Sequence, residues 1–203
     1  MDSLLAQLVL AVAAGYLLGA IPSAYLAGRF LKNLDIRLLG DGNVGAENAY
    51  AELGPKTGVG VVIADIGKGA LAVGTVQASG FAEGAVLAAG VAAVAGHTWP
   101  VYLHFKGGRG AATTIGVLLV ALFPASIVPS LLGLLLAVAR KGTTVACAAI
   151  FIGLQPFVWL IGYPVFVSLF ALGLPVLVGV IHFYSVVLPE YQRTGRLHLR
   201  PKE

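Results

Sequence analysis

Cysteine is almost absent from this 203-residue chain, and charged residues are scarce. The single cysteine, Cys147, lies in an apolar stretch, which excludes an internal disulfide and a cysteine-ligated metal cluster. Only 11% of the residues are charged, against about 25% in a typical soluble domain. Meanwhile 58% are hydrophobic and the mean hydropathy is +0.91. A soluble chain of this composition lacks the polar residues to cover its surface, so the composition predicts an integral membrane protein.

Basic residues are absent from the first positions, Met1 to Ser3, so the basic segment of a cleaved signal peptide is missing. We therefore expect the first apolar segment to be retained. The net charge of +4 fits membrane topology better than nucleic-acid binding, and no nucleic-acid partner is expected. No internal repeat or separate soluble region is evident, which predicts a single membrane domain over residues 1–203.

Apolar segments that approach the length of a membrane span, about 17–25 residues, recur along the chain. Their pattern predicts an all-α, polytopic helix bundle with about seven transmembrane helices. The expected spans are residues 4–30, 58–79, 82–96, 111–123, 126–139, 145–160 and 164–188. Residues 111–139 also allow one bent segment broken at Pro124.

The distribution of cations decides between these alternatives. All Lys and Arg residues except Lys68 lie in or beside the first, third and fifth connections or in the C-terminal tail, with Arg29 at the end of the first span. Positive residues mark the cytoplasmic side, so the N-terminus is predicted outside and the C-terminus in the cytoplasm. Merging residues 111–139 into one span would place Arg140 and Lys141 on the wrong side. Seven spans are therefore favoured.

Lys68 lies inside the second predicted span, three residues after Asp65. Residues at this spacing share one helix face, so the two side chains are expected to pair. Ionisable groups at membrane depth are often functional. A structural ion pair that fixes helix packing is the equally open alternative.

Glycine and basic residues concentrate in the third connection, Phe105-Lys106-Gly107-Gly108-Arg109-Gly110. Glycines allow backbone N–H groups to turn toward one point, and the two cations add positive charge there. The apolar stretch that follows places the loop at a helix N-terminus, which favours anions. These features predict a phosphate or carboxylate site, with a tight turn between two snorkelling cations as the alternative.

A second glycine-rich loop, Gly40–Asn48, lies on the same predicted face. It carries Asp41, Asn43, Glu47 and Asn48, whose side chains can donate or accept hydrogen bonds and whose carboxylates can act as bases. A hydrophilic, turn-rich linker is the simpler interpretation. Because two such loops share the cytoplasmic face, we favour one shared site at the membrane surface.

These loops resemble signatures of the bacterial acyl-phosphate:glycerol-3-phosphate acyltransferases, the PlsY family. Gly40–Asn48 resembles the signature G-S-G-N-x-G-A-T-N, and the segment 64–69 resembles a D-x-x-K-G motif. Gly96-His97, Pro100-Val101 and the stretch 105–113 are similar to the second signature, G-H…P-V…F-K-G-G-K-G-V-A-T. Residues 19–26 also resemble the first-helix segment, so the ordered agreement extends over residues 19–114.

The resemblance implies transfer of a fatty acyl group from acyl phosphate to glycerol 3-phosphate, giving lysophosphatidic acid. It implies no metal or cofactor. It also implies an enzyme of the bacterial inner membrane that is surrounded by membrane lipid and whose site faces the cytoplasm. Catalytic roles fall to Asp41, Asn43 and His182. Phosphate binding falls to the side chains of Lys106 and Arg109 and to the backbone N–H groups of Gly107, Gly108, Arg109 and Gly110. The supporting residues are Glu47, Asn48, Asp65, Lys68, Thr143 and Ser185.

Several positions depart from the signatures. Asp41 replaces a serine, Glu47 a threonine and Arg109 a lysine. Ala51 stands where an arginine is expected, and Ser185 replaces the asparagine of a His-x-x-Asn segment. The first loop thereby becomes more acidic, which is expected to weaken binding of an anionic substrate. Three alternatives stay open: a relative that acylates another acceptor, a non-catalytic protein that binds a phosphorylated lipid precursor, and a small transporter.

Overall fold

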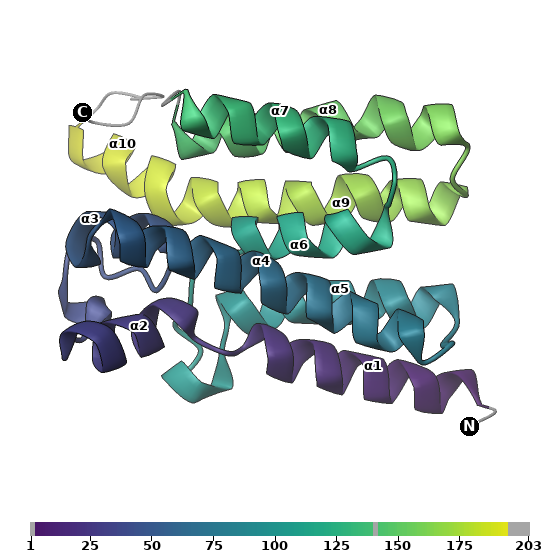
Figure 1. Ribbon diagram of the computed structural model, residues 1–203, viewed down its shortest axis with the longest axis horizontal. Helices are drawn as coiled ribbons and strands as arrows, with labels where there is room; N and C mark the ends of the chain where they lie inside the picture. Colours follow the sequence, from purple (N-terminus) through teal and green to yellow (C-terminus); the bar gives the residue numbers. More distant parts are fainter. Residues whose placement is uncertain (1–2, 140–141, 195–203) are drawn as a thin grey trace. The chain divides into compact units, whose positions relative to one another are not determined.

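The computed structural model describes residues 3–139 and 142–194, and its regular elements are helices (Figure 1). The chain divides into two compact units, Met1–Ala121 and Leu122–Glu203, which we describe separately. Unit 1 contains α1 (Leu4–Gly19), α2 (Ser23–Lys32), η1 (Ile36–Leu38), α3 (Ala46–Leu53), α4 (Pro55–Ala78), α5 (Glu83–Thr98), η2 (Val101–Leu103) and α6 (Ala111–Ala121). Unit 2 contains α7 (Ile127–Val138), α8 (Thr143–Ile161), α9 (Val165–His182), η3 (Phe183–Val187) and α10 (Leu188–Thr194).

The predicted apolar segments coincide with helices. Five helical stretches have the length and hydropathy to cross a membrane, whereas α6 and α7 are shorter apolar helices. The first predicted span differs, because it is divided into α1 and α2 around Pro22. Proline lacks an N–H group and disfavours helical backbone at the preceding residue, which explains the break. The all-α membrane fold is confirmed, with a helix boundary that the hydropathy pattern did not predict.

Glycines let the helices of unit 1 approach closely. Gly15 and Gly19 of α1 lie against the backbone of Ala89 and Ala93 in α5, and a Cβ atom at either glycine would collide with it. Between α4 and α6, Gly69 meets Thr113 in the same way. In lipid, helix association depends on such close packing, because lipid tails are as apolar as the side chains. The glycines thus fix α1 and α6 beside the helices that carry the site.

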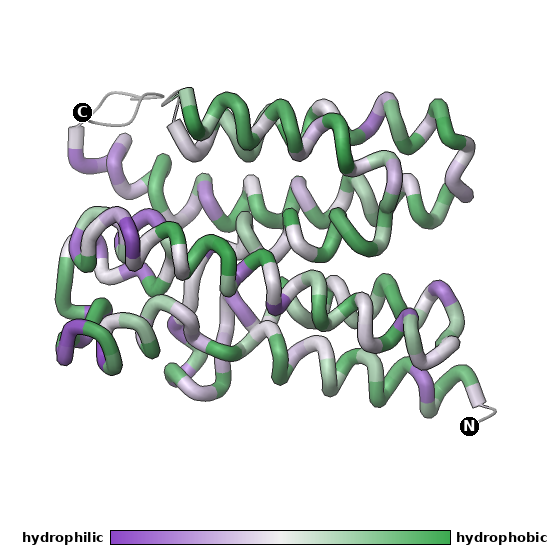
Figure 2. Tube along the Cα trace, in the orientation of Figure 1, coloured by the Kyte–Doolittle hydropathy of each residue, from purple (hydrophilic) through white to green (hydrophobic). Residues whose placement is uncertain are grey.

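The polar end of unit 1 has its own apolar core. Figure 2 shows hydrophilic residues gathered around α2, η1 and α3. Beneath them lies a buried cluster drawn from several elements: Ala24, Ile36, Val44, Ala49, Leu53, Val61 and Leu103. Val44 belongs to the first glycine-rich loop and Leu103 to η2, just before the second loop. Apolar packing therefore anchors both loops to the same core.

Unit 2 is built from the last helices of the chain. Gly133 of α7 packs closely on Ile150 and on the carbonyl oxygen of Ala146 in α8. The Tyr163 hydroxyl, between α8 and α9, donates a 2.7 Å hydrogen bond to the carbonyl of Phe123. Directly after α9 the chain forms the π-helical turn η3, a widened turn that is frequent at functional positions.

Candidate active site

The first loop is organised by Asn48, a buried residue in the first turn of α3. Its Nδ2 group donates to the carbonyls of Leu39 and Asn43 at 3.0 Å each, and to that of Ile36 at 3.4 Å. Gly40 has a φ of +58°, and a Cβ atom there would collide with the Asn48 amide oxygen. Glycine is therefore required at this turn for both conformation and space. Asn48, predicted as a supporting residue, holds the loop in shape.

A charged cluster at η1 braces the start of this loop. Asp35 caps η1 by accepting the Arg37 N–H at 3.1 Å, and its carboxylate also binds the Arg37 guanidinium at 2.7 Å and that of Arg29 at 3.3 Å. The hydrogen bond from the Arg37 side chain, aided by the positive charge, lowers the pKa of Asp35 to about 2. Both guanidinium groups also lie over the Tyr25 ring. Sequence reasoning missed this cluster.

The second loop folds back on the end of α5. The N–H of Gly107 donates to the Thr98 carbonyl and that of Gly108 to the His97 carbonyl, both at 3.1 Å. A Cβ atom on Gly107 would collide with the His97 carbonyl, and one on Gly108 would collide with the imidazole. These two glycines therefore serve close packing, and their N–H groups are engaged within the protein. The prediction that all the loop N–H groups face a phosphate needs this correction.

Arg109 joins the two loops. Its Nη2 atom contacts Asp41 Oδ2 at 2.5 Å, and its Nη1 atom contacts Glu47 Oε2 at 3.4 Å. Sixty-eight residues separate Arg109 from Asp41, so no local pattern predicts the contact. The Arg109 side chain is 17% exposed, whereas those of Asp41 and Glu47 are about half exposed. Both carboxylates that make the first loop more acidic therefore contact Arg109.

Hydrogen-bond donors without acceptors gather where α6 begins. Within residues 3–139 and 142–194, Arg109 Nε and the hydroxyls of Thr113 and Thr114 are buried without a hydrogen-bond partner. Gly110, just before α6, has a φ of +85°, which favours glycine. Because the N-terminus of a helix carries partial positive charge, the start of α6 next to Arg109 is suited to an anion.

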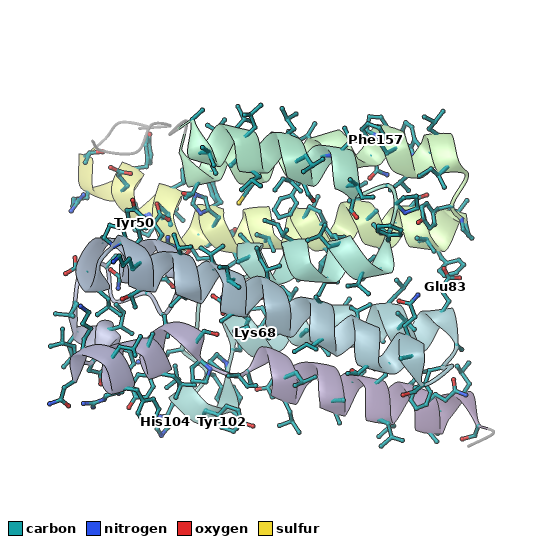
Figure 3. The ribbon with its side chains drawn as sticks, viewed as in Figure 1. Tyr50, Lys68, Glu83, Tyr102, His104 and Phe157 are labelled. Atoms are coloured by element: carbon teal, nitrogen blue, oxygen red, sulfur yellow. The ribbon has the colours of Figure 1, made fainter. Side chains whose placement is uncertain are left out.

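The expected pair between Asp65 and Lys68 forms inside α4. Lys68 Nζ lies 2.8 Å from Asp65 Oδ1 and donates to the Ile21 carbonyl at 2.8 Å, and both side chains are buried. His97 Nδ1 lies 3.6 Å from the same Asp65 oxygen. The pair therefore links α4 to the break between α1 and α2, and through His97 to the glycines of the second loop. Figure 3 shows Lys68 in the interior of unit 1.

Comparison with known proteins identifies the group to which this architecture belongs. A family model described as glycerol-3-phosphate acyltransferase matches residues 9–188. The chain belongs to the glycerol-3-phosphate acyltransferase family. Glycerol-3-phosphate acyltransferase 4 of Dehalococcoides mccartyi is 46% identical over 175 residues, which cover 86% of this chain and 95% of the relative. Glycerol-3-phosphate acyltransferase of a Synechococcus species is 42% identical over 147 residues, covering 72% of each chain.

Two crystal structures of PlsY, an integral membrane glycerol 3-phosphate acyltransferase, share the fold. The glycerol 3-phosphate form superimposes with a TM-score of 0.78 at 32% identity and covers 95% of both chains. The lysophosphatidic acid form gives a TM-score of 0.75 at the same identity, covering 94% of this chain and 93% of that one. The expected resemblance to the PlsY family is confirmed, as is a multi-pass membrane protein.

Family membership gives the departures from the signatures a physical explanation. Asp41, Glu47 and Arg109 are all departures, and all three meet in one cluster. An arginine can contact two carboxylates with a planar fork of donors, which a lysine ammonium lacks. Ala51 lies exposed on α3, and nothing in the structure explains its replacement of an arginine.

The remaining predicted residues belong to unit 2. His182 ends α9, and Ser185 lies in η3 with its hydroxyl donating to the Ile181 carbonyl at 2.7 Å. Thr143 begins α8. Arg140 and Lys141, used to assign topology, lie outside the described residues. The catalytic role expected for His182 and the supporting roles expected for Ser185 and Thr143 stay predictions.

Proposed function

We propose that this protein transfers a fatty acyl group from acyl phosphate to the 1-hydroxyl of glycerol 3-phosphate, giving lysophosphatidic acid and inorganic phosphate. The observation that carries this proposal is the cationic second loop, where Arg109 Nε and the hydroxyls of Thr113 and Thr114 are buried at the start of α6 and have no acceptor among the described residues. Both proposed substrates carry a phosphate that such a site suits. The related PlsY crystal structures, in glycerol 3-phosphate and lysophosphatidic acid forms, support the acceptor and the product.

In the proposed reaction the acceptor hydroxyl oxygen attacks the acyl carbonyl carbon. The bond between that carbon and the phosphate oxygen breaks, phosphate leaves, and the hydroxyl proton passes to a base, for which His182 is our candidate. Lys106 and Arg109 would stabilise the charge on phosphate, while binding both substrates together supplies proximity. The acyl chain would lie in the surrounding lipid or between helices, as expected for a site at the membrane surface.

We further propose that the chain forms one domain that crosses a bacterial inner membrane seven times. Its N-terminus would lie outside, and both glycine-rich loops would lie in the cytoplasm. The cation distribution supports this orientation. After Cys147→Ala, single cysteines introduced by Lys106→Cys or Ser79→Cys would be labelled with a membrane-impermeant maleimide in intact cells; both residues are exposed. Labelling at position 79 and protection at position 106 are expected, and the reverse would contradict the orientation.

Donor and acceptor requirements test the activity. Purified protein in lipid nanodiscs would receive acyl phosphate or an acyl thioester, combined with glycerol 3-phosphate or glycerol. Lysophosphatidic acid is expected only from acyl phosphate with glycerol 3-phosphate. Efficient use of the thioester would overturn the donor, and efficient acylation of glycerol would overturn the role of the phosphate site.

A further inference from the structure

We propose that Asp41 and Glu47 are positioning residues for Arg109, which hold its guanidinium so that the Nε–H is presented to a substrate phosphate. This inference rests on the proposed function and deepens it. Two terminal nitrogens of the guanidinium are engaged, Nη2 by Asp41 at 2.5 Å and Nη1 by Glu47 at 3.4 Å. Nε is buried and, among the described residues, without an acceptor. A buried donor left unsatisfied is unfavourable, so its retention points to a ligand.

Asp41 has a geometry suited to positioning. One carboxylate oxygen, Oδ1, accepts the backbone N–H of Asn43 at 3.0 Å, while the other, Oδ2, contacts Arg109. The backbone of Asn43 is in turn fixed by Asn48, whose Nδ2 group donates to the Asn43 carbonyl. Asp41 therefore connects a rigid turn of the first loop to the guanidinium of the second loop. Because both carboxylate oxygens already have partners, Asp41 is better suited to positioning Arg109 than to accepting a proton as a general base.

The charges of the cluster lead to the same conclusion. The contacting side chains are the carboxylates of Asp41 and Glu47 and the guanidinium of Arg109, so the formal charge of the cluster is −1 (two negative, one positive). Such a site does not attract a phosphate by net charge, and affinity then depends on how well the donors are aimed. A guanidinium gripped at two nitrogens keeps its plane, whereas a lysine ammonium has no plane to fix. Asp41 should matter more than Glu47, because its contact is shorter.

A double-mutant cycle tests this assignment in the full-length protein in nanodiscs. We would measure kcat and KM for glycerol 3-phosphate in Asp41→Asn, Glu47→Gln, Arg109→Lys and the Asp41→Asn/Arg109→Lys double variant. Equilibrium binding of inorganic phosphate would be measured on the same samples. Glu83→Gln is the matched control, because it removes one carboxylate at the opposite end of α5 (Figure 3). Thermal unfolding of each variant reports any loss of folded protein.

In the wild-type background, Asp41→Asn is expected to lower kcat/KM about tenfold, mainly through KM, and Glu47→Gln about threefold. In the Arg109→Lys background, Asp41→Asn should change kcat/KM by less than about twofold, because the group it positions is gone. Phosphate affinity should follow the same pattern. A role confined to the turn at Asn43 would instead give the same loss in both backgrounds.

Three results would overturn the assignment. The first is an equal effect of Asp41→Asn in the two backgrounds, and the second is an unchanged KM in Asp41→Asn. The third is a lowered KM in Asp41→Asn, which would show that the carboxylate competes with phosphate for Arg109. Absence of turnover in the wild-type protein would contradict the proposed function alone. In that case the binding of inorganic phosphate still tests the positioning role. If Asp41→Asn weakens phosphate binding when Arg109 is present but not in the Arg109→Lys background, positioning is supported. If Asp41→Asn leaves phosphate affinity unchanged, positioning is excluded.

Discussion

Two of the clusters in unit 1 that pair carboxylates with cations, Asp65–Lys68 and Asp41–Glu47–Arg109, differ chiefly in burial. Asp65 and Lys68 belong to one helix, lie 2.8 Å apart and are 2% and 6% exposed. Asp41, Glu47 and Arg109 come from two loops, and their carboxylates are about half exposed. Breaking a buried pair leaves a charge that water cannot reach, whereas broken partners at the surface are resolvated. The buried pair should therefore maintain the fold, and the surface cluster should serve the chemistry.

The largest expected effect comes from breaking the buried pair. Lys68→Met removes the ammonium partner of Asp65 and leaves the buried carboxylate with the more distant His97 imidazole, 3.6 Å away, which should destabilise the protein by about 3–5 kcal/mol. The free energy of unfolding in nanodiscs or detergent would be measured, with exposed Lys56→Met on the same helix as the control. Asp65→Asn/Lys68→Met should recover part of the loss. A destabilisation no larger than that of Lys56→Met would contradict the structural role of the pair.

A substitution between the clusters should affect both. In Gly108→Ala the added methyl group meets the His97 imidazole, which neighbours Asp65, and displaces the second loop. Overpacking of this kind should destabilise the protein by about 1–3 kcal/mol and lower the rate of acyl transfer. Gly84→Ala is the control. Gly84 lies in α5, the helix that carries His97, and a Cβ atom added there meets no other atom within 4 Å. Equal behaviour of the two variants would show that the loop does not need its contact with His97.

Lys106, in the second loop, tests how much the exposed charges contribute to binding of glycerol 3-phosphate. It is exposed, so Lys106→Ala should leave the unfolding temperature unchanged and raise the KM for glycerol 3-phosphate by about three- to tenfold at low salt. Screening should shrink this difference at high ionic strength. The KM would be measured from about 20 to 500 mM salt. A difference that does not depend on salt would indicate a direct, desolvated contact with phosphate instead.

The smallest effect is expected from pH at the Asp35 cluster. Its pKa of about 2 in the folded protein is below the usual value of about 3.9, so the stabilisation is complete above that value. It is lost as pH falls from about 4 to 2. The difference in unfolding temperature between wild type and Asp35→Asn should therefore be largest near neutral pH and shrink on acidification. A difference that grows on acidification would contradict the paired state of Asp35.

Much of the fold could be predicted because it depends on local pattern. The apolar segments, and the pairing of Asp65 with Lys68 at a spacing of three, are properties of single helices. The contacts of Arg109 could not be predicted in this way, since they join residues 62 and 68 positions apart. The engagement of the Gly107 and Gly108 N–H groups was also missed, because it depends on how the loop meets α5.

The most direct test of the account compares Arg109→Ala with Lys68→Met in one set of samples, recording unfolding temperature and the initial rate of lysophosphatidic acid formation. We predict that Arg109→Ala changes stability by less than about 1 kcal/mol and lowers the rate by about a hundredfold or more. Lys68→Met should instead lower the unfolding temperature much more than Arg109→Ala does. An Arg109→Ala variant that keeps the wild-type rate, or unfolds as readily as Lys68→Met, would contradict the division between the clusters.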